Sequence, residues 1–181
     1  MVDYILHING RGGSGKSTLV NALNDSLGLE KTSNYTTRKP RYEGEQGYFF
    51  VSEEDFQGRF KNNQIIESYF RKSNGAFYGL PAPTQTGIVQ SEIMGVVALK
   101  KWCFQNNVLF LSIYLDVNSD VLLERLKNRS DINEVPEERL KEDEYYEIFK
   151  HWSDVIYDYN NKTVEQGTDD IFQMMREKGI I

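Results

Sequence analysis

Gly10-Arg11-Gly12-Gly13-Ser14-Gly15-Lys16-Ser17 is the stretch of sequence that decides the fold of this chain. It matches the phosphate-binding pattern G-x-x-x-x-G-K-[ST] at every fixed position. Glycines let the backbone curl so that successive N–H groups point inward, where a phosphate can sit. In such a loop Lys16 reaches the β- and γ-phosphates, and the Ser17 hydroxyl ligates Mg²⁺. The predicted ATP-binding residues are therefore Gly10, Arg11, Gly12, Gly13, Ser14, Gly15, Lys16, Ser17 and Thr18, with Ser17 as the predicted metal ligand.

The residues on either side of this loop have the pattern that a phosphate-binding loop requires. Residues 4–8 form a short, mostly apolar segment that reads as a strand. Apolar residues then recur at helical spacing from Leu19 to Leu27, and Gly28 can end that helix. The N-terminus of the helix adds a favourable field for anions. We therefore expect a strand, the loop and a helix in succession.

The composition of the chain bounds its class. A chain of 181 residues is one domain, or one core with smaller inserted flaps. Its formal net charge of −6 argues against generic binding of nucleic acid or membranes. The lone cysteine, Cys103, excludes an internal disulfide, fits a reducing compartment and lies in a segment that predicts a buried thiol. With no signal-peptide pattern or membrane-length apolar run, we expect a cytoplasmic monomer or homodimer.

Strand and helix patterns alternate along the remaining chain. Residues 108–115 are almost continuously apolar, which is typical of a central parallel strand covered on both faces. Residues 31–47 are polar and rich in turn formers, and the middle of the chain reads as a small β-rich insert. Further strands are predicted at 48–51, 65–70, 75–78, 88–91 and 155–157, and helices after Ser52, near 93–104, after Asn118, from Pro136 through Trp152 and around 171–175. This alternation predicts a three-layer α/β fold with a parallel sheet.

A second motif, Thr36-Thr37-Arg38-Lys39-Pro40-Arg41, lies within the turn-rich segment. Two arginines on either side of a proline turn can form a rigid pair of planar forks. Such forks suit a phosphate dianion better than the point charge of lysine does. A solvated basic turn is the alternative interpretation.

Together the two motifs and the segments that follow resemble the guanylate kinase family. The family's acceptor segment reads much like T-T-R-x-P-R-x-G-E, then G-x-x-Y-x-F-V-S, F-I-E and Y-G. This chain carries those pieces in the same order, ending in Ile65-Ile66-Glu67 and Tyr78-Gly79, so the resemblance covers nearly its whole length. It implies one P-loop kinase domain over residues 1–181, with a core of 1–33 and 86–181. The nucleoside monophosphate (NMP)-binding insert would span 34–85, and a lid about 129–139.

The activity that the resemblance implies is ATP-dependent phosphorylation of a purine nucleoside monophosphate, above all GMP or dGMP. Glu67 would read guanine, because a carboxylate can accept hydrogen bonds from both N1–H and N2–H. Glu67 could instead be an edge-strand charge, and the tyrosines could be ordinary packing aromatics. The acceptor-binding residues implied are Asn34, Arg38, Arg41, Tyr48, Glu67, Tyr78 and Glu92.

The chain departs from the family pattern mainly around the base. Gln90 and Glu92 stand where the family has a pair of aspartates, although Glu92 keeps a carboxylate that can still reach the base. Asn34 replaces a serine, and its amide could donate to O6 of guanine, whereas Leu80 replaces a small hydroxyl residue. Two residues are added between Glu67 and Tyr78, and the family's helix before the next core strand is missing. These changes concern the choice of base more than the class of reaction.

The segment from Glu124 to Leu140 resembles the family's lid, with R-L-x-x-R, a polar stretch and a further R-L. A lid brings cations to the migrating phosphoryl group and expels water. The implied catalytic residues are Lys16, Arg38, Arg125, Arg129 and Arg139. Each lid arginine could also be a solvated helix charge, and Asp158 lies near a family asparagine beside the donor base. A kinase for another nucleotide, a non-catalytic interaction domain and an ATP-hydrolysing switch remain as alternatives.

Overall fold

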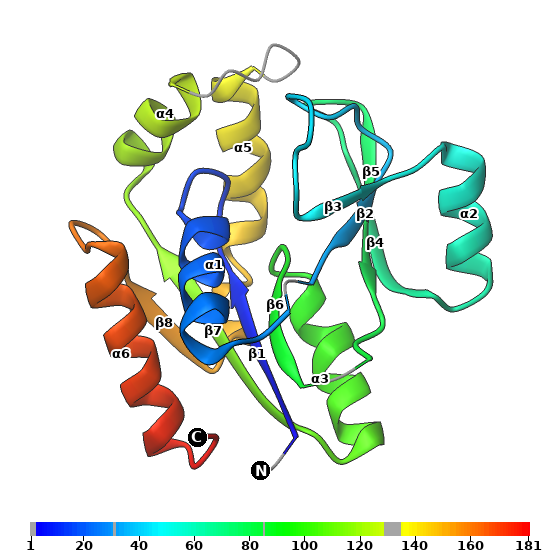
Figure 1. Cartoon of the computed structure of the whole chain (residues 1–181). Helices are drawn as coiled ribbons and strands as arrows, with labels where there is room; N and C mark the ends of the chain where they lie inside the picture. Colours follow the sequence, from blue (N-terminus) through cyan, green and yellow to red (C-terminus); the bar gives the residue numbers. More distant parts are fainter. Residues whose placement is uncertain (1–2, 31, 85, 129–134) are drawn as a thin grey trace.

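The computed structural model describes residues 3–30, 32–84, 86–128 and 135–181 of the chain (Figure 1). The strands are β1 (Tyr4–Asn9), β2 (Asn34–Thr36), β3 (Tyr48–Phe50), β4 (Ile65–Arg71), β5 (Ala76–Pro81), β6 (Gly87–Gln90), β7 (Leu109–Asp116) and β8 (Val155–Asp158). The helices are α1 (Lys16–Leu27), α2 (Glu53–Lys61), α3 (Gly95–Asn106), α4 (Ser119–Lys127), α5 (Pro136–Glu147) and α6 (Val164–Glu177), with a short 3₁₀ helix at Lys150–Trp152.

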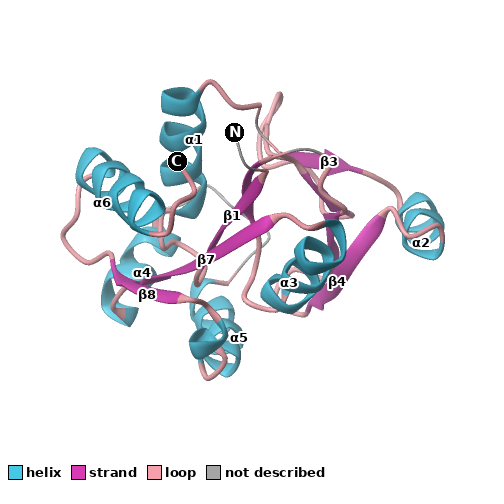
Figure 2. Cartoon of the chain, turned by 90° about the horizontal axis from the view of Figure 1, so that it is seen from below, coloured by secondary structure: helices cyan, strands magenta, loops and turns pink. Residues whose placement is uncertain are grey.

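The core of the molecule is a parallel sheet with the strand order β6-β1-β7-β8. The apolar run of residues 108–115 becomes β7, which lies between β1 and β8 as its composition predicts. Helices α1 and α6 cover one face of this sheet, and α3 and α5 lie on the other (Figure 2). The chain therefore has the three-layer α/β architecture expected from the alternation of strands and helices.

Alternate residues of the core strands pack against opposite layers, because successive side chains of a strand point to opposite faces. Leu6 and Ile8 of β1 pack in one buried cluster with Leu19 and Leu23 of α1. Ile5 instead joins a cluster with residues of α3, among them Cys103, whose buried thiol the sequence predicted. Burial of a leucine side chain contributes about 1.5–3 kcal/mol. These contacts hold the start of α1, and with it the phosphate loop, against the end of β1.

A second sheet, with the order β3-β2-β5-β4, is built from residues of the middle of the chain and lies beside the core (Figure 1). Its strand β2 lies within residues 31–47, which the sequence marked as polar and turn-rich without predicting a strand. Thr36 explains the difference, because its backbone pairs with Tyr78 of β5 and its hydroxyl donates to the carbonyl of Phe77 at 2.9 Å. The propensity of three residues is too weak to reveal such a strand without its partners.

Strand β4 presents Glu67, Tyr69 and Arg71 on one face, because these residues alternate along the strand. The pairing of β4 with β5 has a register irregularity between Ile65 and Glu67, at the start of this alternating stretch. Strand β5 continues to Pro81, beyond the expected end at residue 78, and pairs there with Ile65. Among the described residues no helix separates β5 from β6, in agreement with the gap noted in the sequence.

Helix α5 is shorter than its apolar pattern suggested. It begins at Pro136, as expected, but ends at Glu147, and Trp152 belongs to the separate 3₁₀ helix. The backbone N–H of Phe149 donates to the carbonyl of Tyr146, a three-residue spacing that tightens the chain and ends the α-helix. Across the described ranges, every helix is too short or too polar to cross a membrane.

Candidate active site

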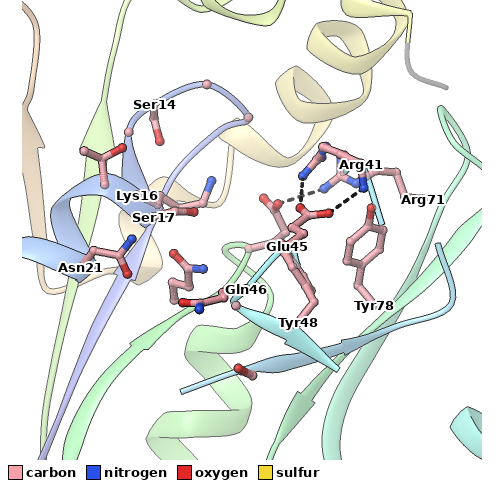
Figure 3. A pocket seen from close by; sticks show the side chains of 18 of the residues that line it. Ser14, Lys16, Ser17, Asn21, Arg41, Glu45, Gln46, Tyr48, Arg71 and Tyr78 are labelled. Carbon is pink, nitrogen blue, oxygen red and sulfur yellow. Dashed lines mark hydrogen bonds and ion pairs between the residues drawn. The ribbon is translucent and has the colours of Figure 1, made fainter. Parts of the chain in front are cut away.

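A cleft of about 1020 Å³ lies between the phosphate loop and the second sheet (Figure 3). Residues 12–18 line one side of it, and residues 41, 42 and 44–48 line the other. Tyr69, Arg71 and Tyr78 of the β4–β5 hairpin, together with Glu92 and Arg139, complete the wall. The cleft thus brings together residues from distant parts of the chain, including most of those predicted to bind the two substrates.

The phosphate loop has the backbone geometry that its glycines predicted. Gly13 and Gly15 have φ angles of 81° and 95°, in the left-handed region that other residues rarely adopt. A Cβ atom at Gly15 would also lie 3.2 Å from the ring of Tyr159. The ammonium group of Lys16 donates to the carbonyl oxygens of Gly10 and Arg11 at 2.6 and 2.9 Å. Lys16 is therefore held across the loop, where it lines the cleft.

The predicted ATP-binding residues do not all present side chains to the cleft. Ser17 and Thr18 are exposed at the start of α1 and line it. Arg11 is buried and points elsewhere, with its guanidinium donating to the Ser119 hydroxyl at 2.9 Å and to the Val117 carbonyl at 2.5 Å. Its side chain holds the segment that leads into α4, so only the backbone of Arg11 is placed to contact ATP.

Both arginines of the second motif are paired with one carboxylate, that of Glu45. Arg38 donates to the two oxygens of Glu45 at 2.9 and 2.6 Å, and Arg41 donates to one of them at 3.1 Å. Burial raises the pKa of Glu45, but the hydrogen bonds and charges of both arginines outweigh this effect and lower that pKa to about 2. Arg41 lines the cleft, whereas Arg38 is buried behind it against the ring of Tyr48.

The tyrosines predicted to hold the acceptor lie close together. The rings of Tyr48 and Tyr78 meet edge to face with centroids 6.0 Å apart, and Tyr69 stacks on Tyr78 at 5.3 Å. The Tyr78 hydroxyl accepts a hydrogen bond from Asn74 at 2.7 Å. Both predicted tyrosines line the cleft, and the Arg38 guanidinium lies over the ring of Tyr48.

A small recess of about 40 Å³ extends from the cleft and contains the residues predicted to read the base. Glu67 lies here with Asn34, Leu80 and Gln90. Burial, and to a lesser extent the negative charge of Glu92, raises the pKa of Glu67 to about 7. The Asn34 amide donates to the backbone carbonyl of Gln90 at 2.7 Å. The recess therefore brings the Glu67 carboxylate together with the Asn34 amide, which already donates to Gln90, and with the apolar side chain of Leu80.

Glu92 also lines this recess, but its carboxylate is engaged by two arginines. One oxygen lies 2.9 Å from a guanidinium nitrogen of Arg71 and 3.4 Å from one of Arg139. The neighbouring Gln90 has a buried amide oxygen without a hydrogen-bond partner among the described residues. Because Ser17 and Gln90 line the same recess, these two oxygens fit the oxygen-donor preference of Mg²⁺. The described ranges contain no group of three or more histidine, cysteine or acidic residues that could hold a metal.

The arginines expected to form a lid have different positions. Arg125 donates to the carbonyl of Gly13 in the phosphate loop at 3.1 Å, and Arg139 lines the cleft. Arg129 falls outside the described residues. Asp158, at the end of β8, is exposed and accepts hydrogen bonds from the backbone and side chain of Asn160 at 3.0 and 2.8 Å.

The sequence interpretation missed Arg71 and Asp143. Arg71 lies four residues after Glu67 on a strand, and Asp143 lies four residues after Arg139 on a helix. Both spacings place each pair on a common face, so the signal was present in the periodicity. The ion pair between Arg71 and Asp143 was not predictable, because the two residues are far apart along the chain.

The model of the guanylate kinase family matches residues 4–175. The chain is 33% identical over 178 residues to guanylate kinase of Mycoplasmoides gallisepticum, which covers 89% of this chain and 88% of the relative. It is 28% identical over 185 residues to guanylate kinase of Fusobacterium nucleatum, covering 96% and 95% of the two chains. The crystal structure of guanylate kinase from Anaplasma phagocytophilum matches with a TM-score of 0.70 at 23% identity, over 98% of this chain and 86% of the other. At that identity the structural match shows a shared fold.

Proposed function

The chain belongs to the guanylate kinase family, and we propose that it transfers the γ-phosphoryl group of ATP to GMP or dGMP in this cleft. The observation that carries the proposal is the arrangement of two half-sites around one cavity. A complete phosphate loop with Lys16 lies on one side, and Arg41, Tyr48 and Tyr78 lie on the other. A donor phosphate and an acceptor phosphate bound there would face each other.

On the donor side, the backbone N–H groups of the loop and the start of α1 bind the phosphates of ATP. Lys16 exchanges its contacts with the carbonyls of Gly10 and Arg11 for the β- and γ-phosphates. Arg125, already bonded to the loop, and Arg139, at the cleft wall, supply further positive charge. Transfer through a loose transition state depends on such cations, because charge spreads over the oxygens of the migrating group.

On the acceptor side, Arg41 and the hydroxyls of Tyr48 and Tyr78 hold the monophosphate. Arg38 supports them through Glu45, which fixes both arginines, and reaches the phosphate if that ion pair opens. One acceptor phosphate oxygen then attacks the γ-phosphorus in line with the leaving ADP. Positioning of the two phosphates supplies most of the catalysis, and no covalent enzyme intermediate is required.

In the base recess, the ionised carboxylate of Glu67 accepts the N1–H and N2–H donors of guanine. Asn34 donates one N–H to the Gln90 carbonyl, which fixes its amide and leaves one further N–H for O6, and Leu80 offers no donor. We therefore propose guanine selectivity weaker than a fully hydrogen-bonded pocket provides. These same contacts support a second candidate, a kinase of this architecture that accepts another nucleotide.

We propose that Mg²⁺ accompanies ATP, with the Ser17 hydroxyl as the protein ligand. When bound, Mg²⁺ neutralises charge on the β- and γ-phosphates. The unpaired amide oxygen of Gln90 lies in the same recess and would hold a water of the ion. The proposal includes a monomer or homodimer that acts in the cytoplasm, without nucleic acid.

The experiment that tests the function measures ADP production with ATP·Mg²⁺ and each common NMP and dNMP in turn. We expect kcat/KM to fall in the order GMP and dGMP, then IMP, then AMP. IMP keeps N1–H but lacks the amine, whereas AMP leaves Glu67 without a donor. Equal or faster turnover of AMP would remove Glu67 as the base reader. Absence of acceptor-dependent turnover would favour a non-catalytic domain, and ADP production without an acceptor would favour an ATPase.

A further inference from the structure

Four charged side chains meet where the insert, the core sheet and α5 come together. They are Arg71 at the end of β4, Glu92 after β6, and Arg139 and Asp143 on α5. Arg71 and Asp143 are each only 3% exposed. A buried charge is strongly unfavourable unless it is paired and hydrogen-bonded, and here each arginine faces carboxylates, with Glu142 of α5 also 4.0 Å from Arg71.

Asp143 is the centre of this cluster, because its two oxygens contact three different parts of the molecule. One oxygen accepts from Arg71 of the insert at 3.0 Å. The other accepts from Arg139 at 2.9 Å and from the backbone N–H of Gly12 in the phosphate loop at 2.6 Å. A single carboxylate thus links the acceptor-side sheet, α5 and the donor loop.

The packing at Gly12 shows how closely α5 approaches the loop. A Cβ atom at this position would lie 2.9 Å from both the Arg139 guanidinium and the Asp143 carboxylate, which is too close for any side chain. A side chain at residue 12 would therefore displace the Arg139 guanidinium and the Asp143 carboxylate from these positions. The contact is specific in geometry as well as in charge.

The guanidinium of Arg71 is occupied by protein groups. One terminal nitrogen donates to Asp143, and the other donates to Glu92 at 2.9 Å and to the Tyr69 hydroxyl at 3.2 Å. Its Nε has no hydrogen-bond partner among the described residues, but it is buried, so the guanidinium has little capacity left for a phosphate in the cleft. Its effect on the reaction is exerted through the residues that it holds.

We infer that Arg71 is a positioning residue for phosphoryl transfer, which acts through Asp143 to fix Arg139 beside the phosphate loop. When the insert packs against α5, Arg71 donates a hydrogen bond to Asp143. Asp143 in turn holds the guanidinium of Arg139 at the cleft. The donor and acceptor halves of the site are thereby assembled together. The inference rests on the proposed function, and it concerns the rate of transfer at saturating substrates more than the binding of ATP.

Steady-state kinetics of single and double variants test the inference. We expect Arg71→Ala and Asp143→Asn each to lower kcat by about tenfold or more, with KM for ATP within about twofold, since small misplacement of reacting groups is costly. Arg71→Lys keeps the charge but not the fork, and should be slowed as well. If Arg71 acts through Asp143, the double variant should be no slower than Asp143→Asn alone.

The matched control is Arg59→Ala, which removes an arginine of the same insert that pairs with Asp55 on the surface of α2. It should leave kcat unchanged. Arg71→Lys serves if Arg71→Ala does not fold, and thermal unfolding identifies that case. Wild-type kcat in a folded Arg71→Lys or Arg71→Ala variant, or independent effects that multiply in the double variant, would overturn the inference.

Amide hydrogen exchange gives a readout that does not depend on turnover. Arg71→Lys should speed exchange at the Gly12 amide, whose partner Asp143 is loosened, whereas Arg59→Ala should not. Unchanged exchange at Gly12 would overturn the inference. If the wild-type protein turned over none of the monophosphates, the proposed function would fail, and this measurement would still decide whether Arg71 controls the loop.

Discussion

Arg38 and Glu45 form a two-point ion pair, with nitrogen–oxygen distances of 2.9 and 2.6 Å, at the back of the acceptor half-site. The same carboxylate accepts from the Arg41 backbone at 2.8 Å and from its side chain at 3.1 Å. Glu45 therefore orders the whole turn that carries both arginines. Fixed arginines bind a phosphate with a smaller loss of conformational entropy than mobile ones.

Glu45→Gln should raise the KM for the acceptor by about tenfold while leaving the KM for ATP nearly unchanged, because charge-assisted hydrogen bonds to both arginines are weakened. Arg41→Ala should have a similar effect through loss of direct contact with the phosphate. Steady-state kinetics with each substrate varied in turn separates the two constants. A variant in which KM for ATP rises instead would place this turn at the donor half of the site.

Lys16→Ala should lower kcat by about 10²-fold or more, since loss of one group that stabilises transition-state charge has effects of this size. The fold should survive, because the hydrogen bonds from Lys16 to the carbonyls of Gly10 and Arg11 lie within the phosphate loop and not in the core. Lys101→Ala, on the exposed side of α3, is the control and should be fully active. Near-normal turnover of a folded Lys16→Ala protein would contradict the donor-site assignment.

The raised pKa of Glu67, about 7, predicts an unusual pH dependence of acceptor selection. Only the ionised carboxylate accepts two hydrogen bonds from guanine, so kcat/KM for GMP should fall about tenfold from pH 8 to pH 6. Glu67→Gln cannot ionise and should show a flatter profile, which also corrects for titration of the acceptor phosphate. Parallel profiles for the two proteins would show that Glu67 does not control binding of the base.

His7 provides a test of the core that is independent of activity. Its ring hydrogen-bonds to Ser112 and Ser91 at 3.0 and 2.7 Å, and burial, followed by the charge of Lys16, lowers its pKa to about 3. The unfolded chain takes up this proton below about pH 6.5, whereas the folded protein does not. Because of His7, the free energy of unfolding therefore falls by about 2 kcal/mol between pH 7 and pH 5.

Glu67 acts in the opposite direction over part of this range, because its folded-state pKa is raised and the folded protein binds its proton first. The comparison must therefore be made between the wild type and His7→Gln. Denaturant unfolding at pH 7 and pH 5 should show that the wild type loses about 2 kcal/mol more than the variant. Equal losses would mean that His7 is protonated within the folded core.

The sequence predicted those parts of the fold whose signals are local. The loop from Gly10 to Ser17 carries its own geometry in its glycines, and the apolar run that forms β7 indicates a strand covered on both faces. Strand β2 was missed because its three residues are stabilised by pairing with β3 and β5, which lie elsewhere in the sequence. The early end of α5 was missed because its apolar pattern continues past Glu147 into the 3₁₀ helix.

The sequence allowed the residues of the candidate site to be predicted from their types, but it did not show which residues form ion pairs with them. Arg38 and Arg41 form a plausible phosphate-binding pair in the sequence, yet nothing local shows that Glu45 holds both of them. Likewise, Glu92 was expected beside the base, whereas its carboxylate pairs with Arg71 and Arg139. The pairing of Glu92 depends on how the insert and α5 approach each other, which periodicity along the sequence does not contain.

The β4–β5 hairpin can differ in length at its tip without a change in the pairing at its base. Its strands pair Ser68 with Gly79 and Arg71 with Ala76, so the tip grows by one residue on each side. Two added residues, which the resemblance to the family pattern predicts in this segment, are the smallest insertion that preserves the pairing nearer the base and the face that Glu67 presents. A single inserted residue would turn the side chains beyond it on one strand to the opposite face of the sheet. A paired insertion instead only extends the reach of the tip, so such a hairpin can gain a contact across the cleft, like that of Arg71, without disturbing recognition at its root.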